Sequence, residues 1–244
     1  MVKWRFLRLE GDAAFNMAVD EALLISGVPT LRLYRFRPSA VTIGYFQKVG
    51  DSVNLDETSR LGVDVIRRVT GGGSVYHDEN GEITYSVAGP LDLFPRNIQD
   101  SIRYICEGVL RAIEFFGLKA DFQPVNDILL AGKKISGSAQ TREGGNLLQH
   151  GTLMYDTDLE TLAKVLKAPK EKLVDKGVSS IYERVTTLSI ELGRRVSFDE
   201  ALNSMIESFS FLGDIEEGEL TEEEWKHVEH LEEKYRSRRW NFRR

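Results

Sequence analysis

Apolar residues recur three or four positions apart in several stretches of this chain, a spacing that predicts amphipathic helices. The first stretch, residues 13–26, follows Asp12, a residue type that caps helices, and is expected to bury one face. The clearest stretch runs from Ile98 to Phe116 and ends at Gly117. Three further helices are expected to close the chain, over residues 158–168, 197–213 and 221–239.

Short apolar runs bounded by turn residues predict strands between these helices. Residues 31–36 and 40–46 form two such runs on either side of a turn at Arg37. Residues 121–155 have the pattern of strands joined by glycine-bearing turns, with Ala131-Gly132 at a hairpin tip. The order of elements predicts an α/β fold of the α+β type, with mixed, largely antiparallel sheets flanked by helices.

The chain length suits one compact domain over residues 1–244. Of its 244 residues 41% are hydrophobic, and it has only 6 prolines and no internal repeat or linker-like tract. We expect a C-terminal helical segment from about 198 to 244 as part of this domain. The acidic stretch from Asp214 to Glu224 is expected to act as a hinge into a solvated terminal helix.

Charge and cysteine content exclude several classes of protein. With 32 Lys and Arg against 38 Asp and Glu, the net charge of -6 argues against general nucleic-acid binding, so any polyanionic ligand must be small. The N-terminus lacks a signal-peptide pattern and no apolar run approaches about 20 residues, which predicts a cytoplasmic protein without a membrane partner. The single cysteine, Cys106, falls mid-helix and is expected to be a buried hydrophobe rather than a nucleophile.

The most unusual segment is RRVTGGGSVYHD, residues 67–78. Three glycines after a strand weaken it, so the backbone is expected to approach a ligand closely. Main-chain N–H groups together with Arg67 and Arg68 suit a phosphate or carboxylate, which predicts a nucleotide or adenylate site. The segment matches neither a P-loop nor GxGxxG. The alternative is a flexible turn with two surface arginines.

A second segment, NDILLAGKKISGSAQ (residues 126–140), places two lysines on a strand that continues into small residues. Alternate side chains of a strand face opposite sides, so only one of Lys133 and Lys134 can point into a site. The alternative for either lysine is a surface charge beside a hairpin.

Together with QHGT at residues 149–152, these segments resemble the lipoate-protein ligase family in order and spacing. The resemblance covers about residues 7–188 and includes VSSIYERVTTL at 178–188. It implies a catalytic domain similar to those of class II aminoacyl-tRNA synthetases and biotin ligases. It also implies that ATP with Mg²⁺ activates lipoate to lipoyl-AMP. The lipoyl group then passes to a lysine of a lipoyl domain, in E2 subunits of 2-oxoacid dehydrogenases or in the glycine-cleavage H protein.

The resemblance also implies roles for particular residues. Lys134 is the expected catalytic residue, placed between the lipoate carboxylate and the ATP α-phosphate. From the residue types themselves, Asp127 is expected to help hold Mg²⁺ or to orient Lys134, although Asn-Asp also opens turns on its own. His77, which follows the glycine segment, is expected to order that loop through Asp78. The positions expected to bind ATP or lipoyl-AMP are Arg68, Gly73, Ser74, Val75, Tyr76, Asn126, Asp127 and Lys134. Those expected to bind lipoate are Gly72, Gly73, Lys134, Ser138 and His150.

Related activities provide the alternatives. Octanoyltransferases of this fold family take the acyl group from acyl carrier protein through a cysteine thioester, which the mid-helix Cys106 does not favour. The Gly-Arg-Gly-Arg loop of biotin ligases is absent. A non-catalytic adenylate-binding relative is the third alternative. About 56 residues follow Leu188, too few for the accessory domain of many lipoate ligases. We therefore expect activation to need a separately encoded accessory protein.

Overall fold

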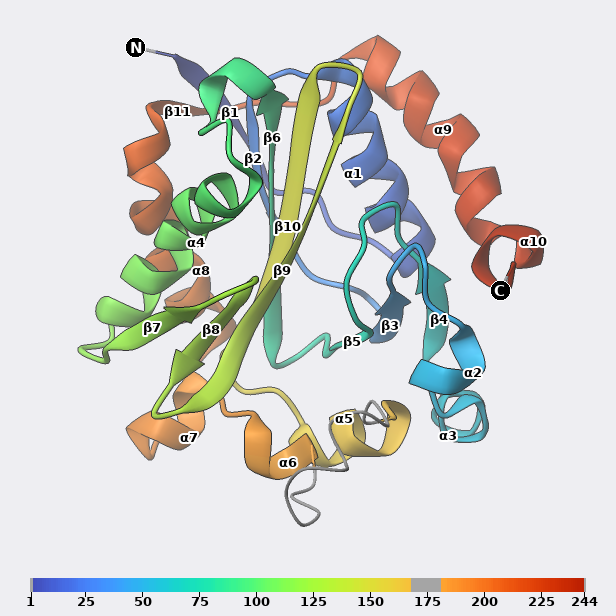
Figure 1. Cartoon of the computed structure of the whole chain (residues 1–244), viewed down its shortest axis with the longest axis vertical. Coiled ribbons are helices and arrows are strands. Elements are labelled where there is room, and N and C mark those ends of the chain that lie inside the picture. Colours follow the sequence, from blue (N-terminus) through green and yellow to red (C-terminus); the bar gives the residue numbers. More distant parts are fainter. Residues whose placement is uncertain (1, 168–180, 244) are drawn as a thin grey trace.

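The computed structural model describes residues 2–167 and 181–243 and has two sheets packed with helices (Figure 1). The larger sheet has the strand order β11-β1-β2-β6-β10-β9-β8-β7, and the smaller has the order β4-β3-β5. The strands of the large sheet are β1 (Lys3–Leu7), β2 (Thr30–Tyr34), β6 (Glu82–Pro90), β7 (Ala120–Gln123), β8 (Asp127–Leu130), β9 (Lys133–Glu143), β10 (Asn146–Met154) and β11 (Asp214–Glu217). Those of the small sheet are β3 (Ala40–Ile43), β4 (Asp64–Arg67) and β5 (Val75–His77).

Pairing in both sheets is mixed, and in the large sheet it is mostly antiparallel, as the sequence predicts. Strand β1 runs parallel to both β2 and β11, and the remaining pairs of the large sheet are antiparallel. In the small sheet β3 is parallel to β4 and antiparallel to β5. The hairpin tip at Ala131-Gly132 is also confirmed, because both residues have the positive φ angles that a tight hairpin turn requires.

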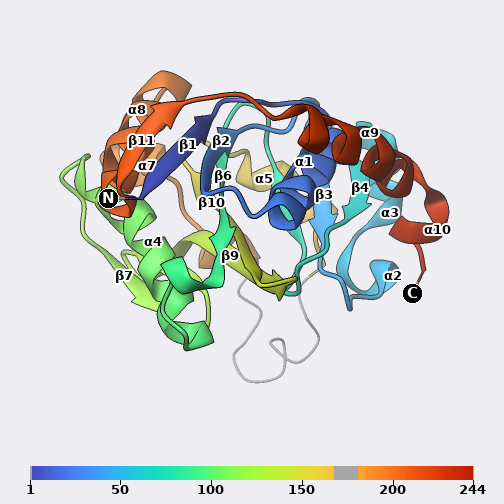
Figure 2. The same cartoon turned by 90° about the horizontal axis from the view of Figure 1, so that it is seen from above.

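Helices cover both faces of the large sheet (Figures 1 and 2). The helices are α1 (Ala13–Ser26), α2 (Val49–Ser52), α3 (Leu55–Leu61), α4 (Ile98–Glu114), α5 (Leu159–Val165), α6 (Ile181–Arg184), α7 (Leu188–Leu192), α8 (Phe198–Ser208), α9 (Glu222–Arg236) and α10 (Arg238–Asn241). Neighbouring residues of β10 point to opposite faces: Leu147 packs in the core that contains α4 and α8, and Leu148 packs in the core beneath α1 and α9.

Helix α1 is buried on nearly all sides rather than on the one face that its pattern predicts. It starts at the predicted cap, where the Asp12 side chain accepts a hydrogen bond from the Phe15 backbone. The sheet lies on one side of it and α9 on the other, so Asn16 and Asp20 are buried as well as its apolar residues. Buried polar groups must be paired, which makes this helix a source of hydrogen bonds inside the protein.

Helix α4 has nearly its predicted limits and ends near Gly117, which has a left-handed φ of 74°. Asn97 caps its first turn. Ile98, the first predicted core position, is instead 60% exposed because it lies on the first turn, beyond the core. Cys106 is buried in the middle of the helix, as expected.

The prediction of an acidic hinge and a solvated terminal helix is wrong. Residues 214–217 form β11, which extends the edge of the large sheet beside β1. Helix α9 packs along α1, with Val228, Leu231 and Tyr235 buried in the interface. The acidic residues of this stretch serve structure, since Glu224 binds Arg5 of β1 with oxygen to nitrogen distances of 2.6 and 2.7 Å.

The C-terminal turn α10 is bonded directly to the strand that precedes the glycine segment. The Asn241 side-chain oxygen accepts the Arg67 backbone N–H at 2.9 Å, and the Trp240 indole N–H donates to the Arg67 carbonyl at 2.7 Å. The fully buried Arg67 guanidinium donates in turn to the carbonyls of both residues. Arg67 therefore holds this turn in place.

Within residues 2–167 and 181–243, every helix is too short or too polar to cross a bilayer. The motif at 178–188 and the predicted helix at 158–168 each lie partly outside the described residues. Helix α5 occupies 159–165 and helix α6 occupies 181–184.

Candidate active site

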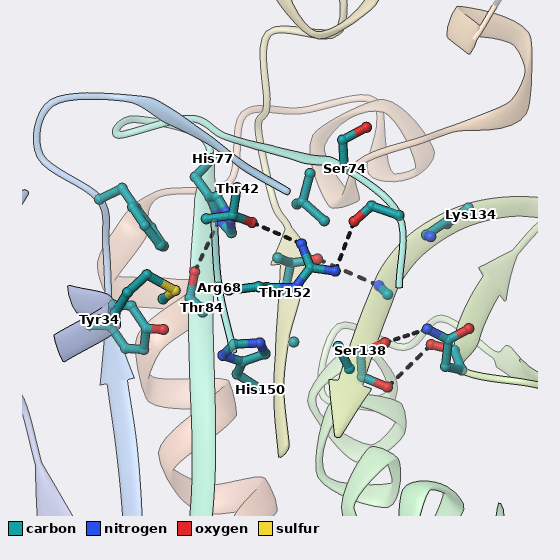
Figure 3. Close-up of a pocket in the computed structure, with 18 residues that line it drawn as sticks. Tyr34, Thr42, Arg68, Ser74, His77, Thr84, Lys134, Ser138, His150 and Thr152 are labelled. Carbon is teal, nitrogen blue, oxygen red and sulfur yellow. Dashed lines mark hydrogen bonds between the residues drawn. The ribbon is translucent and has the colours of Figure 1, made fainter. Parts of the chain in front are cut away.

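A cleft lies where the small sheet meets the centre of the large sheet (Figure 3). Its walls come from the glycine segment, from β9 and β10, and from the buried ends of α1, β2 and β6. The lining residues are Met17, Tyr34, Phe36, Thr42, Arg68, Gly73, Ser74, Val75, His77, Thr84, Asn126, Lys134, Gly137, Ser138, Ala139, His150, Gly151 and Thr152.

The cleft brings together most of the positions singled out from the sequence, although they are spread over more than 80 residues. Arg68, Gly73, Ser74, Val75, Asn126, Lys134, Ser138 and His150 all line it. Gly72, Tyr76 and Asp127 do not. The Tyr76 side chain packs in the core, where burial raises the pKa of its phenol to about 12, and only its backbone belongs to the β5 edge of the site.

Arg68 shapes the glycine loop from below. One guanidinium nitrogen, Nη2, donates to the carbonyls of Gly71 and Gly73 at 2.6 and 2.8 Å. Gly72 has a φ of 90°, and a Cβ there would lie 2.9 Å from the same nitrogen, so both conformation and space require glycine. The side chain is 4% exposed, and burial lowers the pKa of Arg68 to about 10. The neighbouring Arg67, expected to add charge to the site, is committed to α10 instead.

Lys134 faces the cleft, whereas Lys133 is exposed. A β-bulge between β8 and β9 pairs Ile128 with Ser136 and Leu129 with Lys134, leaving Ile135 as the extra residue. This shift puts Lys134 on the same face of the strand as Gly137. The Lys134 ammonium lies 2.7 Å from Asp127, and a Cβ at Gly137 would come within 2.7 Å of the same nitrogen. The geometry thus favours Asp127 as the partner that orients Lys134.

Asn126 fastens the loop before β8 to β9. Its side-chain amide donates to the Ser138 carbonyl, and its own carbonyl accepts from the Ser138 backbone N–H at 2.9 Å. Below Ser138, the Cys106 sulfur lies 3.5 Å from the serine hydroxyl. Cys106 is 1% exposed, is not among the lining residues, and burial raises the pKa of its thiol.

His150 is held between two buried groups. Its Nδ1 lies 2.9 Å from Asp20 and its Nε2 lies 2.7 Å from the Thr70 hydroxyl. Burial lowers the pKa of His150, which outweighs the opposite effect of the Asp20 carboxylate, so the ring is neutral at pH 7. Asp20 also accepts hydrogen bonds from Arg32, Tyr34 and Ser86, so the proton of the ring is on Nδ1.

His77 does not order the glycine loop through Asp78, as the sequence suggested. Its ring bonds Glu82 and Thr42 at 2.9 and 3.0 Å and stacks on Phe36. Asp78 instead accepts the backbone N–H of Asp158, the residue that caps α5. His77 is therefore part of the cleft floor.

The residues missed by the sequence reasoning are the buried ones beneath the ligand-facing surface. Asp20 and Arg32 form an ion pair at 2.8 Å with both side chains at most 1% exposed. A signal was present, because Asp20 follows the apolar run MAV and Arg32 lies between the leucines of LRLY. A charged residue at a core position predicts a buried partner, but not which one.

Among the described residues, no three His, Cys, Asp or Glu side chains are grouped so as to hold a metal ion. A cation at this site would depend mainly on ligand oxygens. Asp127, which is already paired with Lys134, is the nearest carboxylate to offer.

Solved structures with the same architecture give the class of protein. The chain superposes with a TM-score of 0.87, at 35% identity, on a structure from Thermoplasma acidophilum described as a bi-partite lipoate protein ligase, covering 99% of this chain and 97% of that one. A lipoate-protein ligase A bound with ATP gives a TM-score of 0.86 at 33% identity, covering 98% of each chain. The fold is therefore that of a lipoate-ligase catalytic domain.

Residues 12–210 match the lipoyl protein ligase A/B catalytic domain, and the chain belongs to that family. Two relatives are named octanoyltransferase LipM. The one from Kyrpidia tusciae is 36% identical over 100% of both chains, and the one from Bacillus subtilis is 32% identical over 99% and 98%. The chain is thus an enzyme of the lipoate ligase and transferase family. The name of these relatives agrees with the octanoyltransferase alternative better than with an ATP-dependent ligase.

Proposed function

We propose that this enzyme is a lipoate-protein ligase that activates lipoate with ATP and transfers the lipoyl group to a lysine of a lipoyl domain. The observation that carries the proposal is the pair of cations, Arg68 and Lys134, on a cleft closed by a glycine loop. A carboxylate and a phosphate that must react with each other repel, and two fixed cations offset that repulsion. Solved relatives described with bound ATP and with bound lipoic acid support this assignment.

In the activation step, the lipoate carboxylate oxygen attacks the ATP α-phosphorus and pyrophosphate leaves. Lys134 would donate hydrogen bonds to both reacting groups, and the glycine loop would present backbone N–H groups to the phosphate. ATP would arrive with Mg²⁺, which keeps several waters and needs few protein ligands. Asp127 could touch that cation only by giving up part of its ion pair with Lys134.

In the transfer step, the amine of the acceptor lysine attacks the lipoyl carbonyl carbon and AMP leaves. The amine must first be neutral. His150 is already neutral, but its Nδ1–H faces Asp20 and its Nε2 faces the Thr70 hydroxyl, so it is not free to take the proton. The positive charge of Lys134 near the incoming amine would favour loss of that proton without a dedicated base.

The state of Cys106 argues against a thioester route. The sequence contains 1 cysteine, and its sulfur lies behind Ser138 with 1% of the residue exposed. The thiolate is the nucleophilic form of cysteine, and burial disfavours it by raising the pKa of the thiol.

Octanoyl transfer from acyl carrier protein is the second candidate, and the name of the relatives at 36% and 32% identity favours it. In that reaction Cys106 would have to become exposed, take the octanoyl group as a thioester and pass it to the acceptor lysine. The two candidates differ in their need for ATP and for the sulfur atom.

Mass spectrometry of a lipoyl domain after incubation with the enzyme separates the candidates. One reaction contains lipoate, ATP and Mg²⁺, and the other contains octanoyl-acyl carrier protein. We expect no octanoyl mass in the second reaction. In the first we expect an added lipoyl mass that is strong only when the separately encoded accessory protein proposed below is also present. We expect Cys106→Ala to keep at least about half of that activity, because the thiol takes no part in it.

Preformed lipoyl-adenylate serves as a control that bypasses activation. Octanoylation without ATP that disappears in Cys106→Ala would establish the second candidate and overturn the first. If neither substrate nor lipoyl-adenylate modifies the acceptor, the chain is not an active member of the family.

The similar Thermoplasma structure is described as a ligase in two parts together with its E2 lipoyl domain. By analogy we propose that E2 subunits or H protein supply the acceptor domain here, and that a separately encoded accessory protein supports the activation step. An accessory protein that acts on activation alone would leave transfer from lipoyl-adenylate unaffected.

A further inference from the structure

Two chains of hydrogen bonds, which we call arms, hold Arg68. Each arm runs from the guanidinium through a threonine and a histidine to a buried carboxylate. The first arm starts at Nε, which donates to the Thr70 hydroxyl at 2.9 Å. Thr70 donates to Nε2 of His150 at 2.7 Å, and His150 Nδ1–H donates to Asp20 at 2.9 Å. Every residue of this arm is buried, with an exposed fraction of at most 7% for the whole residue and for the His150 side chain.

The second arm starts at Nη1, which donates to the Thr42 hydroxyl at 3.2 Å. The Thr42 hydroxyl lies 3.0 Å from His77 Nε2, and His77 Nδ1 lies 2.9 Å from Glu82. Each threonine hydroxyl has a single hydrogen. Each hydroxyl also has two lone pairs, so it can accept from Arg68 and still donate its hydrogen to the histidine Nε2 behind it. Figure 3 shows Arg68 between Thr42 and the glycine loop, with His77 and His150 on either side.

The arms leave Arg68 without a carboxylate in direct contact among residues 2–167 and 181–243. Its four bonds go to two hydroxyls and two carbonyls. A bidentate carboxylate would orient the guanidinium equally well, but it would also cancel the charge that an anionic ligand needs. Arg68 has five N–H groups, and four bonds account for four of them. Among the described residues nothing is bonded to the remaining N–H on Nη1, so a ligand could accept from it.

We propose that Thr42 and Thr70, each backed by its histidine and carboxylate, are positioning residues that set the orientation of Arg68 and, through Arg68, the conformation of the glycine loop over the cleft. The arms hold Nε and Nη1 of the guanidinium, which leaves Nη2 to bond the loop carbonyls while the charge stays available to the ligand. This inference rests on the proposed function only for the identity of that ligand, an acyl-adenylate.

Substitution of each threonine by valine tests the arms, because valine keeps the shape and removes the hydroxyl. The first readout is solvent exchange of the Arg68 Nε–H in ¹⁵N NMR spectra, with the signal assigned from its loss in Arg68→Lys. We expect Thr70→Val to speed this exchange by at least about tenfold and Thr70→Ser to keep it near the wild-type rate. The second readout is calorimetric affinity for a non-hydrolysable acyl-sulfamoyl adenosine, which we expect to fall by about tenfold in Thr70→Val and in Thr42→Val.

Thr58→Val is the matched control. Thr58 is 2% exposed, and within the described part of the chain its hydroxyl donates only to the Leu55 carbonyl of α3, so its loss should change neither readout. Wild-type exchange and wild-type affinity in Thr70→Val would overturn the proposal, and so would loss of affinity in Thr58→Val to the same degree. Arg68→Gln separates the identity of the ligand from the positioning of Arg68 by the arms. If it binds the adenosine compound normally, the proposed ligand is wrong, while the exchange rates still decide whether the arms position Arg68.

Discussion

Lys134 is positioned by a neighbour with no side chain at all. Gly137 leaves the space through which the lysine reaches Asp127, and the bulge at Ile135 brings the two residues onto one face. The alternation of side chains along a strand does not predict this arrangement. Simple alternation correctly indicates that only one of Lys133 and Lys134 faces the cleft, but it groups Lys134 with Ser136 rather than with Gly137.

Lys134→Ala should abolish activation while leaving the protein folded. Lys134 is partly exposed, so its loss opens no core cavity, whereas a fixed cation at the reacting phosphate contributes about 10²–10³-fold in rate. Lipoate-dependent pyrophosphate release, measured with the accessory protein present, shows the effect, and Lys133→Ala is the control that should keep activity. A large fall in the thermal midpoint of Lys134→Ala would show instead that the residue is structural.

Gly137→Ala should reduce activity with little change in stability. The added methyl would collide with the end of a flexible side chain, so Lys134 would swing aside at small cost in folding free energy. We expect pyrophosphate release, again measured with the accessory protein present, to fall by about tenfold or more and the thermal midpoint to change by less than about 4 °C. Gly50→Ala, where a Cβ meets nothing within 4 Å, is the control. Equal activity in the two variants would contradict this role of the glycine.

At the scale of elements, the sequence predicts the helices and strands better than what they pack against. Periodicity locates α1, α4 and the β8–β10 hairpins because their apolar residues face a core in regular order. It does not indicate that α1 is covered by α9, because the apolar face of α9 is narrow and its composition is dominated by charge. Strand β11 is missed for the same reason, since DIEE has no apolar alternation and depends on pairing with β1.

Besides its apolar contacts, α9 docks through a buried carboxylate, Glu224. Burial by itself raises the pKa of Glu224, but hydrogen bonds from Arg5, the Thr221 backbone and Ser26 outweigh burial and lower the pKa to about 2. The ordinary value is 4.5, so the ionised carboxylate stabilises the fold fully above about pH 4.5, and this contribution is lost as the pH falls toward 2.

Glu224→Gln should therefore lower stability at pH 7 by about 1–3 kcal/mol, because it leaves Arg5 with a weaker partner. For a protein of this size the thermal midpoint should fall by about 2–4 °C per kcal/mol. The difference from wild type should shrink as the pH drops below 4.5. Glu223→Gln, on the exposed side of the same turn, serves as the control. A difference that stays constant down to pH 3 would refute the assigned role of the charge.

At the scale of the whole molecule, the charge of the cleft has the opposite sign to the net charge of the chain. The chain carries a net charge of -6, yet the lining of the cleft, taken over the described residues, contains Arg68 and Lys134 and no carboxylate. Composition argues against a nucleic-acid groove, but it cannot show where positive charge is concentrated. Segments that are distant in sequence bring Arg68 and Lys134 together only in the folded protein. The motifs indicated the surface of the site, whereas the charged network beneath it became visible only in three dimensions.

The activation and transfer steps should separate when this chain is tested alone. With lipoate and ATP we expect weak or no pyrophosphate release, because activation would need the accessory protein. With preformed lipoyl-adenylate we expect the acceptor domain to be modified, since that step needs only the cleft and the incoming lysine. Intact-mass measurement of the acceptor detects both. Complete ATP-dependent lipoylation by the chain alone would refute the requirement for an accessory protein.

The contact between the C-terminal turn and Arg67 has a practical consequence for every such assay. Trp240 and Asn241 are bonded to the backbone one residue before Arg68, so proteolytic trimming of a few terminal residues would disturb the ligand loop. A trimmed preparation would resemble a binding-site mutant on every kinetic plot while remaining folded. Intact mass is therefore the first measurement to make on any sample, and a removable tag is better joined to the other end.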